Sequence, residues 1–185
     1  MIPTREQAME ILKEYNKNES LITHALSVEA VMRHYAELYN EDVEFWGAVG
    51  LLHDLDYELY PDEHCKKVIE LLEGKGVDEK MIRAIVSHGY NICSDVEPVH
   101  TMEKILYTTD ELTGLITATA LMRPSKSMSD LEYKSVWKKY KSANFAVGVD
   151  RSIIEKGCEM LGLELKSIIE EVIVAMRKVS ADIGL

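Results

Sequence analysis

Leu51-Leu52-His53-Asp54-Leu55-Asp56-Tyr57 is the stretch from which both the fold and a candidate site can be read. The ten residues before His53, Val43 to Leu52 (VEFWGAVGLL), are nearly all apolar and predict a buried helix. A carboxylate at the end of such a helix is unfavourable unless it is paired or coordinated, because it has been removed from water. His53 and Asp54 therefore either form hydrogen bonds within the fold or bind a metal ion.

The composition is typical of a soluble globular chain. The 185 residues suit one domain with a sizeable core, and 46% of them are hydrophobic. The net charge of −11 disfavours nucleic-acid polymers and anionic membranes as partners, and no apolar run approaches the ~20 residues of a membrane span. The polar N-terminus and three cysteines without paired spacing predict a cytoplasmic protein with free thiols.

Capping residues and apolar periodicity predict an all-α helical bundle of about eight or nine helices. No segment alternates with the period of a strand. The predicted helices are one after Thr4, one capped by Ser20, one from Asp42 to about His53-Asp54, one from about Asp62, one from Asp78 to His88, one from about Val99 to Met122, one opened by Ser129 and Glu132 and ending near Lys141, one from Asp150 to Gly162, and one from about Glu164.

Six polar side chains fall on five of these helices, mostly beside apolar stripes: His24, His53, Asp54, His64, His88 and Asp110. Imidazoles and carboxylates without thiolates suit a divalent transition metal such as Mn, Fe, Co, Ni or Zn. Helical bundles build such sites from inward-facing side chains of separate helices.

Each of these residues also has an interpretation without a metal. A lone His24 on an apolar stripe is a satisfied core histidine, and His64 in a first helical turn is an exposed one. His34 is predicted to lie at the surface, and His100 to be structural or solvated near a helix start. Cys65 and Cys93 are interpreted as packed thiols rather than ligands.

The order His24, His53-Asp54, Asp110 resembles the signature of the HD-domain superfamily of metal-dependent phosphohydrolases. The resemblance covers roughly residues 20–123. We therefore expect a single HD-type domain over residues 1–185, with a core at 20–123 and a C-terminal helical extension at 124–185. The resemblance implies that these four residues bind one divalent metal ion.

Members of the superfamily with two ions carry two more histidines between the doublet and the last Asp. His64 and His88 stand in those places, and Asp54 would then bridge the ions. The cofactor implied is one or two divalent ions, with Mn, Fe, Co, Ni, Zn and Mg left open. Gly89-Tyr90 lacks the proline of the GYP variant that cleaves cyclic dinucleotides.

The resemblance implies a phosphohydrolase that acts on a small, anionic phosphorylated metabolite or nucleotide, with metal-bound hydroxide attacking phosphorus. Asp54 and Asp56 are the candidate catalytic carboxylates, and Asp56 is alternatively a residue that orients a ligand. Arg123 and Lys126 open a segment, up to Arg151, in which basic residues exceed acidic ones, and they are the candidate phosphate contacts.

Two other functions stay open. The same ligand set in some superfamily members holds two irons and activates O₂ to cleave a C–C or C–P bond. A non-catalytic, metal-stabilised binding module is the other alternative. The apolar final helix is a candidate interface between copies of the chain, which leaves a homo-oligomer open.

Overall fold

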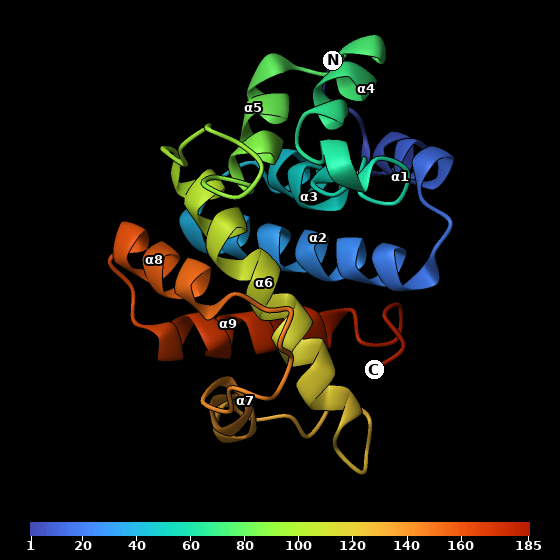
Figure 1. The fold of residues 1–185 in the computed structure, drawn as a ribbon. Helices are drawn as coiled ribbons and strands as arrows, with labels where there is room; N and C mark the ends of the chain where they lie inside the picture. Colours follow the sequence, from blue (N-terminus) through green and yellow to red (C-terminus); the bar gives the residue numbers. More distant parts are fainter.

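The computed structural model describes residues 1–185, and nine α-helices and one 3₁₀ turn form the whole of its regular structure (Figure 1). The predicted all-α class is therefore confirmed. The elements are α1 (Arg5–Tyr15), α2 (Glu19–Tyr39), α3 (Val43–Leu52), the 3₁₀ turn (Pro61–Glu63), α4 (Lys67–Gly74), α5 (Glu79–Ser87), α6 (Thr101–Leu121), α7 (Tyr133–Tyr140), α8 (Arg151–Leu161) and α9 (Leu165–Lys178).

The long helix α2 lies at the centre of the bundle, with α3 packed along it, α9 beside it and α6 crossing it (Figure 1). Gly50 allows α3 to approach α2 closely, because a Cβ at this position would lie 2.9 Å from the carbonyl oxygen of Val28. The apolar run of α3 is buried as predicted, and it delivers His53 and Asp54 to the middle of the molecule.

One hydrophobic core joins all parts of the chain, since a single cluster of buried side chains extends from Ala8 to Ile183. The expectation that His34 lies at the surface is wrong. Helix α9 covers this side of α2, and buried His34 donates from Nε2 to Glu171 at 2.6 Å and accepts from Lys178 at Nδ1. None of the helices combines the length and apolar character that crossing a membrane requires.

The caps of α3, α5 and α8 are those predicted, because Asp42, Asp78 and Asp150 each accept a backbone N–H of the first turn. The predicted start of α2 is wrong. Asn18, not Ser20, is its N-cap, and its side chain accepts the N–H of Ser20 at 2.9 Å.

Two further predicted starts are wrong. Cys65 adopts a left-handed backbone with φ of 65°, which interrupts the helix, so α4 begins at Lys67 and His64 lies in the preceding turn. Ser129 does not open a capping box. Its N–H donates to Ser127 Oγ within a turn, and α7 begins only at Tyr133.

Candidate metal centre

The six side chains singled out in the sequence lie together in the structure. His24 comes from α2, His53 and Asp54 follow α3, and Asp110 lies in the middle of α6. The other two are His64, in the turn before α4, and His88, at the end of α5. Their donor atoms form two groups that share Asp54.

The first group consists of His24, His53, Asp110 and one oxygen of Asp54. Asp110 Oδ1 lies 2.9 Å from His24 Nε2 and 3.3 Å from His53 Nε2. Asp54 Oδ2 lies 3.6 and 3.3 Å from the same two nitrogens. Donors about 2.1 Å from a shared ion lie about 3.0–3.4 Å apart at angles near 90–110°, so this spacing suits one cation.

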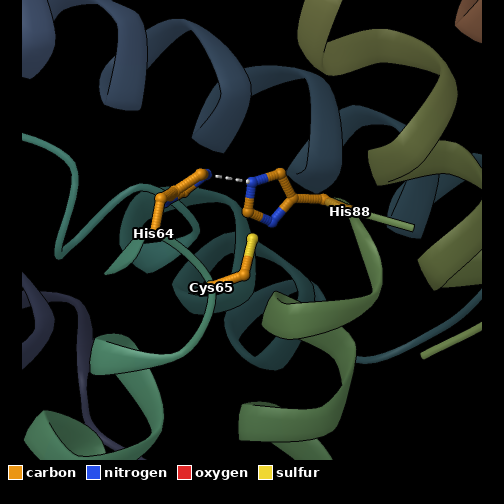
Figure 2. Close-up of side chains that lie close together, drawn as sticks. All are labelled: His64, Cys65 and His88. Atoms are coloured by element: carbon orange, nitrogen blue, oxygen red, sulfur yellow. Dashed lines mark hydrogen bonds between the residues drawn. The ribbon is translucent and has the colours of Figure 1, made fainter. Parts of the chain in front are cut away.

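The second group contains His64, His88 and the other oxygen of Asp54. The two Nε2 atoms are 3.2 Å apart, and Figure 2 shows the rings turned toward each other. Asp54 Oδ1 lies 3.5 Å from His64 Nε2 and 3.4 Å from His88 Nε2. Asp54 thus presents one oxygen to each group, which is the arrangement of a bridging carboxylate.

The hydrogen bonds on the far side of each ring assign its tautomer. Nδ1 of His53 donates to the carbonyl of Gly50 at 2.8 Å, and Nδ1 of His88 donates to the carbonyl of Ile85 at 2.5 Å. Nδ1 of His64 donates to Asp56, and Nδ1 of His24 faces the hydroxyl of Thr113. In the neutral rings, all four Nε2 lone pairs therefore point into the centre.

Lone pairs that face each other and two carboxylates repel unless positive charge lies between them. Protons supply that charge in the ion-free chain: burial lowers the pKa of His53, but the carboxylates outweigh burial and hold this pKa well above its usual value. Burial likewise opposes the ionised form of Asp54, and His53 holds the pKa of Asp54 well below its usual value. A divalent cation would supply the same charge, so the donor set fits a metal.

A family model described as "HD domain" matches residues 21–127, which is more than half of the chain. The chain belongs to the HD domain family. The family is of the metal-dependent hydrolase type, and its divalent-metal chemistry agrees with the two histidine–aspartate groups of the structure. No solved structure matches the chain.

The matched HD domain region contains all six candidate ligands. Cys65 is also near: its thiol, His64 and His88 offer donor atoms within 4.8 Å of one another. Figure 2 shows the sulfur beside the His88 ring. The oxygen of Asp54 lies close to both Nε2 atoms, and the buried thiol packs with that of Cys93 against Gly89, so we assign Cys65 to packing.

Asp56 is completely buried behind His64. It does not line the cavity that opens over the donor atoms. Its Oδ1 accepts from His64 Nδ1 at 2.7 Å, and its Oδ2 accepts the N–H of Val68 at 2.9 Å. The structure therefore favours the alternative in which Asp56 orients a ligand over one in which it contacts substrate. Burial lowers the pKa of His64, but this hydrogen bond together with the charges of Asp54 and Asp56 raises it above its usual value.

Arg123 and Lys126 lie away from the cavity. Asp110 and the end of α6 at Leu121 are about 16 Å apart along the helix axis, at a rise of ~1.5 Å per residue. The guanidinium of Arg123 binds Asp130 at 2.8 Å and Ser135, and Lys126 sits in a turn with φ of 48°. The length of α6 thus separates both predicted phosphate contacts from the histidines.

A cavity of about 390 Å³ opens over the donor atoms of the HD domain. Its floor contains His24, Asp54, His64, His88 and Asp110, and its walls contain Tyr57, Gly89, Ile92, Cys93, Tyr107, Glu111, Gly114, Val149 and Ile153. None of these wall residues was predicted individually as a ligand, a catalytic residue or a phosphate contact. Helical spacing places Tyr107, Glu111 and Gly114 on the same side of the helix as Asp110. This spacing could have identified these three wall residues as neighbours of a candidate ligand.

Proposed function

We propose that the chain is a phosphohydrolase that uses two divalent ions to cleave a small phosphorylated metabolite or nucleotide. The observation that carries this proposal is the position of Asp54, whose two oxygens face the two histidine groups. His24, His53 and Asp110 would hold one ion with Asp54, and His64 and His88 would hold the other. Bound divalent ions supply a water of lowered pKa and neutralise charge on phosphoryl oxygens.

The protein itself orients the ligands and shapes the cavity. Asp56 and the carbonyls of Gly50 and Ile85 fix the ring tautomers, so the nitrogen lone pairs stay aimed at the centre. The cavity size suits a small molecule and not a polymer. Ile92, Val149 and Ile153 give the cavity an apolar lining on one side.

The second candidate is a di-iron oxygenase. Four imidazoles and two carboxylates suit iron as well as manganese or zinc. The cavity also contains no lysine or arginine, which is unusual for a protein that binds phosphate esters. Iron content and O₂ consumption with candidate substrates would support this alternative.

The test compares two variants with the same substitution. The protein is loaded with Mn²⁺, Co²⁺, Mg²⁺ or Zn²⁺ and assayed against phosphomonoesters and phosphodiesters. His53→Asn should abolish hydrolysis and reduce metal content, whereas His100→Asn, at the cap of α6, should leave both unchanged. A metal-loaded wild-type protein that hydrolyses no ester would contradict the proposal and favour the oxygenase or a non-catalytic module.

A further inference from the structure

The cavity wall lacks the positively charged side chains that proteins commonly use to bind phosphate groups. No lysine or arginine lines the cavity, and Glu111 is the one charged side chain outside the six candidate ligands. Any phosphoryl group must then be neutralised by the ions alone. A second anionic group on the same substrate would face a carboxylate, so polyphosphates and carboxylated phosphoesters fit poorly.

Glu111 has no cationic partner in the fold. Its only hydrogen bond is accepted from the backbone N–H of Asp150 at 3.2 Å, and it takes part in no salt bridge. Lys156 lies on α8, which packs against α6, and its Nζ lies 4.7 Å from the centre of the Tyr90 ring. A partly buried carboxylate without a counter-charge is unfavourable for folding, so its presence in the cavity wall points to a ligand that supplies the charge.

The neighbours of Glu111 suit a small cation. Tyr107 lies one helical turn before Glu111 on the same face of α6, and Tyr57 is also in the wall. Aromatic rings attract ammonium groups, and carboxylates accept hydrogen bonds from them. Gly114, on the same face, carries no side chain, and a Cβ there would approach only Val149, at 3.9 Å, which keeps the wall open.

We propose that Glu111 binds a positively charged amine of the substrate, which is therefore a short aminoalkyl phosphoester with its phosphoryl group over the histidines. The position of the phosphoryl end rests on the proposed function. Asp110 and Glu111 line the same cavity of about 390 Å³, so the two ends of the substrate are separated by a short linker. Glu111 is in this sense a specificity-determining residue.

Three phosphonates of similar size test the proposal by binding, without turnover. They are 2-aminoethylphosphonate, n-propylphosphonate and 3-phosphonopropionate, which end in an ammonium, a methyl group and a carboxylate. Calorimetry with the Mn²⁺-loaded full chain should give tightest binding for the amine, by about tenfold over the propyl compound, and weakest for the carboxylate. Equal affinities, or no binding of the amine, would overturn the proposal.

Two variants separate recognition from folding. Glu111→Gln keeps an acceptor for the N–H of Asp150 but loses the charge, so the preference for amine over propyl should fall below about threefold. Glu111→Lys should reverse the order and favour the carboxylate. Glu159→Gln, on the exposed side of α8, is the matched control and should keep the wild-type preference. An amine preference that persists in Glu111→Gln would overturn the proposal.

The two proposals fail in different ways. A chain that prefers the amine through Glu111 but hydrolyses no phosphoester retains the amine-binding role of Glu111 and loses the proposed function together with the phosphoester. A chain that hydrolyses phosphoesters without regard to their terminal charge retains the proposed function and loses this inference.

Discussion

Asp56 Oδ1 accepts a hydrogen bond from His64 Nδ1 at 2.7 Å, while the other oxygen of the same carboxylate accepts the N–H of Val68. One buried side chain thus fixes both the ring of a candidate ligand and the first turn of α4. The turn between them needs this support because it contains the left-handed residue Cys65.

Asp56→Ala should lower both stability and metal affinity. Loss of the carboxylate leaves buried donors of His64 and Val68 unsatisfied, so the free energy of unfolding should fall by about 2–4 kcal/mol. Metal affinity should fall by about 10–100-fold, because His64 loses the group that orients it. Denaturant unfolding and metal titration measure the two effects. In Asp56→Asn, which keeps an acceptor, a loss as large as that of the alanine variant would contradict this role.

Removal of metal should destabilise the protein, because the ions bind only the folded centre. At a free ion concentration a hundred times the dissociation constant, one bound ion adds about 2.7 kcal/mol to the free energy of unfolding. We expect a chelator to lower the Tm and elemental analysis to give two ions per chain. His64→Asn should retain one ion. A single ion in the wild type would limit the site to His24, His53, Asp54 and Asp110.

Gly50→Ala should disturb the contact between α2 and α3. The added methyl group would lie 2.9 Å from the carbonyl oxygen of Val28, and backbone on both sides resists the shift, so we expect a loss of about 1–3 kcal/mol. Gly74→Ala is the control, because nothing lies within 4 Å of its Cβ position. It should be neutral or slightly stabilising. Thermal unfolding of both variants provides the comparison.

Glu111→Gln should change the pH dependence of stability in the metal-free protein. Burial, followed by the charge of Asp110, raises the pKa of Glu111 from 4.5 to about 7. Between these values the folded state holds a proton that the unfolded state has lost, so this group lowers stability as the pH rises through that range. The variant should therefore gain about 1–2 kcal/mol at pH 8, allowing for partial exposure, and little at pH 4.5.

The control for this measurement is Glu159→Gln, whose carboxylate is exposed on α8. It should follow the wild-type stability curve at every pH. Burial predicts that Glu111→Gln raises the free energy of unfolding at pH 8. A variant that is less stable than the wild type at this pH would contradict the prediction and indicate that the bond to the N–H of Asp150 dominates.

The sequence predicted the fold class because helices depend on local pattern, whereas the grouping of the six donors was implied by the resemblance to the HD-domain superfamily. Apolar spacing specifies helices, and Asp42, Asp78 and Asp150 carry their capping function in their own side chains. The interior position of His34 was not predictable from α2 alone, since α9 covers it from 137 residues away. A contact between distant segments produces no periodic pattern in the sequence of either segment.

The same limit explains the misplaced phosphate contacts. Arg123 and Lys126 follow Asp110 closely in the sequence, but a straight helix converts that separation into distance. Glu111, in contrast, lies at the cavity but was not recognised as a site residue. It adjoins Asp110 in the sequence, and only the packing of α8 over α6 turns its surroundings into a cavity wall.

That wall has a consequence for how the protein can change. Every candidate ion-holding residue falls between positions 21 and 127, whereas Val149 and Ile153, which help to enclose the cavity, come from the later segment that leads into and forms α8. One side of the cavity wall is thus encoded apart from the floor, while Glu111 lies in the same stretch as the candidate ligands. Mutation or design in the later stretch can alter which molecules are admitted while the reactive floor is inherited intact.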